Sequence, residues 1–140
     1  MNILFCLTPK SDVDYVTEDA SLFKTLQTME RRNHSAIPII SKKGRYIGTI
    51  TAGDILGCIK TNFNLSLKDS ADFPVKNVHR TRDNQAVSVN SKMEDIVEII
   101  LTQNFVPVVD DDENFIGIIT RKEIVMWLHD RLLDNETDIK

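Results

Sequence analysis

The chain has 140 residues, of which 41% are hydrophobic and 27% charged, and its formal net charge at pH 7 is −4. This length and composition are typical of one compact globular protein that buries a real core. The negative charge argues against nonspecific nucleic-acid binding, which needs a basic surface, and no apolar run approaches the roughly 18 residues of a membrane span. The first ten residues also lack the features of a signal peptide, so we expect a cytoplasmic protein that binds neither DNA nor membrane.

In the first half of the chain, the predicted elements follow a simple order. A short extended stretch near residues 14–16 precedes a helix whose apolar stripe spans residues 22–29. A strand over residues 36–40 and a second strand over residues 46–50 are separated by a polar turn of about five residues, which is the spacing of a β-hairpin. A closing helix follows, with Ile55 on its apolar face.

The second half repeats this order. An extended stretch near residues 86–89 precedes a helix with an apolar stripe at residues 93–101, a hairpin of strands over residues 105–109 and 115–119, and a closing helix that includes Ile124. Each half is therefore predicted to be a β-α-β-β-α unit, so the fold class is α/β (α+β). One half of about 60 residues would leave a sheet face poorly covered, so we expect the two to pack together with pseudo-two-fold symmetry.

The two halves are also related in sequence. Residues 35–56 and residues 104–125 align without a gap, and six aligned positions are identical. These include Pro38 and Pro107, each near the start of an apolar strand. Ordered matches at this density indicate an internal repeat, so we expect two copies of one structural unit.

We predict a first domain at residues 1–66, a linker at residues 67–78 and a second domain at residues 79–140. The linker belongs to a polar, irregular segment that contains Pro74, and we expect it to connect the two copies rather than to form a third domain. Residues 134–140 are highly charged and are expected to form a frayed tail.

Two sequence motifs connect this organisation to a known family. Each copy has an apolar strand that contains proline, and each has a related motif where the closing helix starts, IGTITAGD in the first copy and IGIITRKE in the second. In these features the chain resembles a tandem pair of CBS domains, also called a Bateman module. The segments NHSAIPII and NFVPVVDDDENFIGIITRK are further similar to the small stand-alone CBS-pair proteins of Gram-positive bacteria, which resemble cyclic di-AMP (c-di-AMP) receptors.

The resemblance implies that adenine nucleotides bind in clefts between the two copies. It places the hydroxyl and the carboxylate of the T-x-x-[DE] element at the ribose, and the backbone of the proline-containing strand at the base. The strands near residues 16–17 and 88–89 would line the floors of the clefts. The implied ligand-binding residues are Ser35, Ala36, Ile37, Pro38, Thr51 and Asp54 for the first site, Phe105, Val106, Pro107, Thr120 and Glu123 for the second, and Val16, Thr17 and Val89 on the floors.

Arg121 and Lys122 raise an electrostatic question. They occupy the first turn of the second closing helix, where the positive end of the helix dipole disfavours cations unless an anion offsets them. Arg121 has no internal partner within sequence reach. A nucleotide phosphate above this helix start would meet free N–H groups, the dipole and the two cations together. We therefore add Arg121 and Lys122 to the second site and expect that site to dominate.

The T-x-x-[DE] element has an alternative interpretation that needs no ligand. In a capping box, the threonine oxygen accepts a hydrogen bond from an amide of the first helical turn, and the acidic side chain reaches back. This interpretation applies to Thr51 with Asp54 and to Thr120 with Glu123. Capping does not account for Arg121, whose charge worsens the interaction with the helix dipole.

No residue pattern indicates catalysis. The sequence has neither a Ser-His-Asp nor a Cys-His set, no glycine-rich phosphate loop and no H-E-x-x-H motif, and its three histidines lack the spacing of metal ligands. We therefore expect no enzyme activity, no metal and no cofactor.

Two functions remain open, namely a sensor of an adenine nucleotide that controls an unidentified partner protein, and an interaction scaffold that binds no ligand. The subgroup resemblance favours c-di-AMP over AMP, ADP or ATP as the ligand. It also implies a two-fold homodimer, with Trp127, Ile124, Phe23 and Leu26 as candidate contacts. Trp127 is either part of the local core or part of such a self-association surface.

Overall fold

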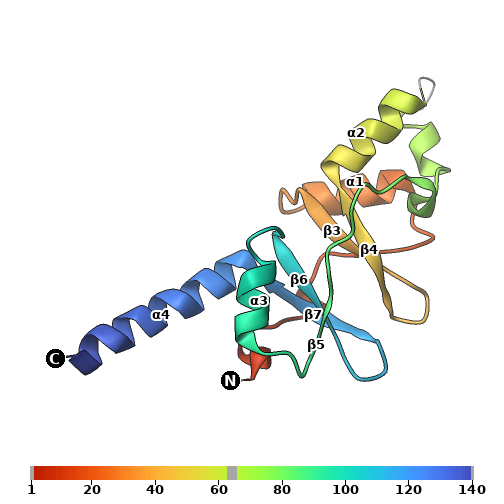
Figure 1. Ribbon diagram of the computed structural model, residues 1–140. Coiled ribbons are helices and arrows are strands. Elements are labelled where there is room, and N and C mark those ends of the chain that lie inside the picture. The colour runs from red at the N-terminus through yellow and green to blue at the C-terminus, as the bar shows by residue number, and fades with distance from the viewer. Residues whose placement is uncertain (1, 63–65, 140) are drawn as a thin grey trace. The chain divides into compact units, whose positions relative to one another are not determined.

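The computed structural model describes residues 2–62 and 66–139, without the side chains of residues 136–139. Within these residues the fold is mixed α/β, with four α-helices and two sheets, as the sequence analysis predicted (Figure 1). The backbone forms two compact units, one made of residues 14–84 and 113–115 and the other of the remaining residues.

The first unit holds the first copy of the repeat. Strand β2 (Val16–Thr17) runs parallel to β3 (Ala36–Ile40), and β3 pairs antiparallel with β4 (Tyr46–Thr51). Helix α1 (Leu22–Glu30) connects the two parallel strands, and α2 (Ala52–Thr61) begins directly after β4. The predicted extended stretch, helix, hairpin and closing helix are therefore confirmed in their predicted order.

Strand β3 and the two helices build the core of this unit. From Ile37 to Ile40 every residue of β3 is buried, which is the pattern of a strand that is covered on both faces. Ser21 fixes the start of α1, because its Oγ accepts a hydrogen bond of 3.0 Å from the Lys24 N–H. The buried core residues are Val16, Leu22, Met29, Ile37, Ile39, Ile50, Ile55, Cys58, Val75 and Val78.

The segment predicted as a linker, residues 67–78, packs into this unit. Val75 and Val78 lie in the core with 0% and 3% of their surface exposed. Backbone hydrogen bonds of 2.7 and 2.8 Å fasten residues 73–75 to residues 20–22, at the start of α1. The segment therefore contributes buried apolar surface to the first unit. Its two short 3-10 helices are η3 (Asp69–Ala71) and η4 (Val75–Asn77).

The second unit combines the second copy of the repeat with the first thirteen residues of the chain. Its strands have the order β1-β7-β6-β5, with β5 parallel to β6 and the N-terminal strand β1 antiparallel to β7. Residues 1–13, predicted as part of the first domain, thus belong to the second unit, where they supply the unpredicted strand β1. The elements of this unit are η1 (Ile3–Cys6), β1 (Thr8–Pro9), η2 (Lys10–Asp12), β5 (Val87–Ser88), α3 (Met93–Ile99), β6 (Phe105–Val109), β7 (Phe115–Thr120) and α4 (Arg121–Ile139).

Strand β1 approaches β7 very closely at Gly117. Gly117 has a φ of +155°, and a Cβ built on it would collide with the carbonyl oxygen of Thr8 and come within 2.9 Å of the Leu7 side chain. Glycine tolerates this backbone conformation because it has no Cβ. The glycine of the second repeat motif therefore lets the N-terminal strand pair with the sheet.

Helix α4 continues to Ile139, so the expectation that residues 134–140 form a frayed tail is wrong for the described part of that tail. Lys140 lies outside the described residues. Among the helices that the structure describes, none is long and apolar enough to span a membrane.

Candidate functional site

The T-x-x-D element of the first copy lies where β4 turns into α2. Thr51 is the N-cap of α2, and its Oγ1 accepts a hydrogen bond of 3.0 Å from the Asp54 N–H. In return, Asp54 Oδ2 accepts a bond of 3.1 Å from the Thr51 N–H. This reciprocal pair is the capping box that the sequence allowed as the alternative interpretation.

The second oxygen of the Asp54 carboxylate is also occupied. Oδ1 accepts two hydrogen bonds of 3.1 Å, one from the N–H and one from the hydroxyl of Thr81. Only 6% of the surface of Asp54 is exposed. The carboxylate that the resemblance places at a ribose is therefore bonded to three donors of its own chain, one on Thr51 and two on Thr81.

Thr81 belongs to residues 80–84, a segment that we call the strap. Asp83 fastens the strap to β4, because its Oδ1 accepts a hydrogen bond of 2.9 Å from the Thr49 N–H. The same oxygen accepts a bond of 2.8 Å from Nε of Arg80, which lies within the strap. Burial raises the pKa of Asp83, but these hydrogen bonds outweigh burial and hold the pKa below its ordinary value. The carboxylate that holds the strap is therefore ionised at neutral pH.

The glycine of the first repeat motif makes room for the strap. A Cβ on Gly48 would collide with the Asp83 carboxylate. On the same strand, the Tyr46 hydroxyl donates to the Asn84 carbonyl at 2.8 Å and lies 2.7 Å from Thr49 Oγ1. Burial raises the pKa of Tyr46 to about 12, so the hydroxyl keeps its proton at neutral pH. The strap is therefore bonded to β4 through Asp83 and Asn84, and to α2 through Thr81.

A cavity of about 300 Å³ lies along α2 beside these contacts. Gly53 and Gly57 leave it open, and a Cβ on Gly57 would meet nothing within 4 Å. Of the lining residues, only Asp54 was predicted to bind the ligand, although two glycines four residues apart on one helix are a signal for such an opening. The lining includes Gly53, Asp54, Gly57, Thr61, Asn62 and Thr81.

The T-x-x-E element of the second copy is bonded differently. Thr120 Oγ1 accepts a hydrogen bond of 3.2 Å from the Glu123 N–H, but no bond from the described residues to the Glu123 carboxylate is found. Glu123 is half-buried. Burial raises the pKa of the Cys6 thiol, and the negative charge of Glu123 raises it further, so this thiol stays protonated at neutral pH. The second copy has half of a capping box and a carboxylate with acceptor capacity to spare.

Arg121 has partners that the sequence did not reveal. Its Nε donates to the Ile100 carbonyl at 3.2 Å, and its Nη2 donates to the Gln103 carbonyl at 3.0 Å. Ile100 is the C-cap of α3, where the helix dipole is negative. The expectation that Arg121 lacks an internal partner is therefore wrong, because the Ile100 carbonyl at the end of α3 and the Gln103 carbonyl in the following loop offset its charge. Lys122 is exposed, and no hydrogen bond or ion pair of its ammonium group is found in the described part of the chain.

The proline-containing strands are placed alike in the two copies. The Ala52 N–H donates to the Ser35 carbonyl, and the Arg121 N–H donates to the Asn104 carbonyl, both at 2.9 Å. Each bond ties the start of a strand to the start of a closing helix. Of the residues that the resemblance implies, Val16, Ile37, Pro38, Phe105, Val106 and Pro107 are buried, whereas Thr17, Ser35, Ala36 and Val89 are exposed or half-buried.

The repeat, the sheet in each unit and the two T-x-x-[DE] elements agree with comparison to known families. The family model described as the CBS domain matches residues 6–61 and residues 75–130. The chain belongs to the CBS domain family. This CBS pair is similar to CbpB, solved in complex with c-di-AMP, with 25% identity, a TM-score of 0.84, and coverage of 100% of this chain and 91% of that one. The predicted resemblance to stand-alone CBS-pair proteins is confirmed.

Two further relatives of this CBS pair extend the comparison. CBSX2, solved in complex with AMP, has 21% identity and a TM-score of 0.74 over 92% of this chain and 96% of that one, which supports the fold. The uncharacterized protein MJ1426 of Methanocaldococcus jannaschii is 25% identical over an alignment 138 residues long. The match covers 79% of this chain and 82% of the relative. The chain spans only 45% and 38% of two longer relatives from the same organism.

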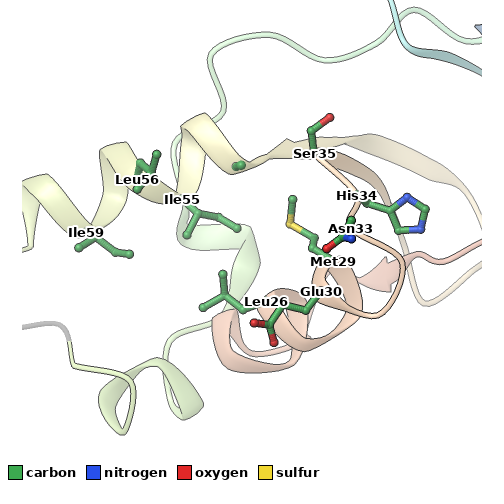
Figure 2. A pocket seen from close by; sticks show the side chains of 10 residues that line it. Leu26, Met29, Glu30, Asn33, His34, Ser35, Ile55, Leu56 and Ile59 are labelled. Atoms are coloured by element: carbon green, nitrogen blue, oxygen red, sulfur yellow. The ribbon is translucent and has the colours of Figure 1, made fainter.

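Each repeat of the CBS pair also carries an apolar groove between its two helices. The groove of the first repeat has a volume of about 510 Å³ and lies between Leu26 of α1 and Leu56 and Ile59 of α2 (Figure 2). The groove of the second repeat has a volume of about 410 Å³, and Trp127 and Leu132 of α4 line it. Equivalent helices therefore leave equivalent apolar surfaces in the two repeats.

Only some of the residues expected at a homodimer contact line these grooves. Leu26 and Trp127 line the grooves, whereas Phe23 does not. Trp127 also packs against the core of the second unit, with the Arg131 guanidinium 4.7 Å from the centre of its ring. Ile124 is fully buried, so the expectation that it takes part in such a contact is wrong.

Proposed function

We propose that this CBS pair binds an adenine nucleotide and regulates a partner protein, and that c-di-AMP is its ligand. The observation that carries the proposal is the similarity over the whole chain to a CBS-pair protein solved with c-di-AMP. The contacts of the second repeat support it. There the exposed Lys122 stands at the start of α4, beside a Glu123 carboxylate that can still accept hydrogen bonds. A helix start of this kind favours a phosphate.

The chemistry of the ligand fits the groups that the second repeat offers. c-di-AMP carries two phosphates and two adenines, so it requires cations at a helix start together with apolar surface for the bases. Lys122 supplies one cation, and the guanidinium of Arg121 has N–H groups beyond the two that bind the carbonyls of Ile100 and Gln103. Residues 105–107 would contact a base, while Thr120 and Glu123 would meet a ribose.

The second candidate is a general sensor of AMP, ADP or ATP, which the similarity of the fold to CBSX2 with AMP favours. A calorimetric titration of the full chain separates the two. We expect c-di-AMP to bind at least about tenfold more tightly than AMP, a difference of about 1.4 kcal/mol. Equal affinities would support the general sensor, and the absence of binding by any adenine nucleotide would leave the ligand-free scaffold.

Lys122→Ala is expected to weaken nucleotide binding without a loss of stability. Its ammonium group has no partner among the described residues, so its removal costs the fold nothing, whereas a phosphate at the start of α4 loses a cation. We expect about a fivefold loss of affinity, on the order of 1 kcal/mol, in calorimetry at low salt.

Two variants control for this result. Lys68→Ala removes an exposed lysine from the other unit and should leave nucleotide affinity unchanged. Arg121→Ala also removes the bonds to Ile100 and Gln103, so it should lower the melting temperature, which Lys122→Ala should not. Unchanged binding in Lys122→Ala would show that the phosphates do not lie at the start of α4.

We further propose that the CBS pair forms a homodimer through its two apolar grooves. A two-fold contact joins the same surface of both protomers, and each repeat presents an apolar groove of similar construction. Light scattering at micromolar concentration is expected to give the mass of a dimer. Leu56→Glu, at the exposed rim of the first groove, should give a monomer. A monomeric parent protein would contradict the proposal.

A further inference from the structure

Asp54 and Glu123 occupy equivalent positions of the repeat but differ in their bonds. Asp54 accepts three hydrogen bonds from Thr51 and Thr81, whereas none from the described residues to the Glu123 carboxylate is found. A carboxylate oxygen accepts about two hydrogen bonds, so Asp54 Oδ1 is fully used by Thr81. A ribose hydroxyl that donates to this oxygen must therefore displace a donor of Thr81.

We propose that the strap, residues 80–84, is an internal competitor for the first nucleotide site. This inference rests on the proposed function. The N–H and O–H of Thr81 offer Asp54 two neutral donors, which is the chemistry that the two hydroxyls of a ribose offer. Asp54 Oδ1 is closed to a ribose hydroxyl while Thr81 is bonded to it, and a ribose takes this oxygen only after Thr81 has moved.

The surroundings of Thr81 allow this exchange. Asp54 is buried, but Thr81 itself is exposed, so the bond between them forms at the surface of the unit. The cavity of about 300 Å³ along α2, which Gly53 leaves open beside Asp54, gives a sugar a route to the carboxylate. The strap is held further along by Asp83, whose bond to the Thr49 N–H must also yield if the whole segment leaves.

The strap is followed directly in the sequence by the second unit. The strap ends at Asn84, and the second unit resumes at Gln85, the next residue. Gln85 is held there by the side chain of Gln103, which accepts from its N–H at 2.7 Å and donates to its carbonyl at 3.2 Å. A nucleotide on Asp54 therefore releases Thr81, while Asp83 and Asn84 still hold the strap to β4.

Thr81→Val tests the competition, because it removes the hydroxyl that donates to Asp54 and keeps the shape of the side chain. In calorimetric titrations of the full chain with AMP and with c-di-AMP, we expect the weaker of the two sites to bind about tenfold more tightly, a gain of about 1.4 kcal/mol. Thr102→Val is the matched control. Thr102 is an exposed threonine of the second unit whose hydroxyl donates to the Ile99 carbonyl at 3.2 Å, and its replacement should change neither site.

Amide hydrogen exchange provides a readout that needs no nucleotide. We expect the amides of Thr81 and Asn84, which are hydrogen-bonded in the structure, to exchange about tenfold faster in Thr81→Val than in the parent, and to exchange faster in the parent when nucleotide is added. Unchanged exchange of the strap in Thr81→Val would overturn the inference, because Thr81 would not be holding it.

The binding outcomes separate this inference from the proposed function. Nucleotide binding by the parent with no gain in Thr81→Val would overturn the competition and leave the proposed function standing. The absence of binding by both the parent and Thr81→Val, with the strap released in the variant, would overturn the proposed function and the competition with it.

Discussion

Asp54→Ala is expected to lower the free energy of unfolding by about 3 kcal/mol, because it removes a buried acceptor from three donors and breaks the capping box of α2. The N–H of Thr51 and the two donors of Thr81 lose their partner together. Urea denaturation of the nucleotide-free protein, followed by circular dichroism, measures the change. The resemblance assigns this residue to a ligand, but its largest measurable role without ligand is structural.

The repeat provides the matched control for this variant. Glu123→Ala changes the equivalent position of the second copy, where no bond from the described residues to the carboxylate is found. We expect its effect on the free energy of unfolding to stay within about 0.5 kcal/mol, as for a substitution away from such contacts. Equal losses in the two variants would mean that the bonds of Asp54 with Thr51 and Thr81 contribute nothing to stability.

Gly117→Ala is expected to lower the free energy of unfolding by about 3 kcal/mol or more, because a new Cβ would have to displace backbone at a φ that disfavours side chains. The added atom would collide with the Thr8 carbonyl, which is part of the pairing between β1 and β7. Thermal and urea unfolding of the variant measure the loss.

Gly57→Ala is the control for a glycine replaced without a collision. A Cβ at this position in α2 meets nothing within 4 Å. Alanine is the better helix former by about 1 kcal/mol, so this variant should be more stable than the parent. If Gly117→Ala unfolded at the same urea concentration as the parent, β1 would not be held against β7 in solution.

The repeated part of the fold could be predicted from the sequence, because its strands and helices carry complete hydrophobic patterns. The predicted strands at residues 36–40 and 105–109 are those of the structure. Strand β1 has only two residues, Thr8 and Pro9, and no pattern of two residues can reveal a strand. Val75 and Val78 were missed as core residues because the segment around them is polar, and only tertiary packing buries them.

The candidate site was predictable only where its chemistry is local. Thr51 and Asp54 are three residues apart, so the capping box could be anticipated from spacing alone. The bond from Thr81 to Asp54 and the bonds from Arg121 to Ile100 and Gln103 join residues that are far apart in the sequence. No periodicity reports such partners, and for this reason the charge of Arg121 was assigned wholly to a ligand.

Because β1 pairs with β7, the N-terminal strand can join its sheet only after β7 has been synthesised. A ribosome makes Thr8 early and Ile118 late, yet these residues are partners in the sheet. Their pairing closes a loop of about 110 residues. Contacts of such high sequence separation form slowly, because the entropy of loop closure is lost before the contacts stabilise the fold. Residues 14–84, which make up all of the first unit except residues 113–115, can fold during synthesis, while the N-terminus must wait for β7. A chain released before β7 emerges therefore exposes an unpaired strand and an apolar 3-10 turn, which are the surfaces that chaperones bind and that aggregation uses.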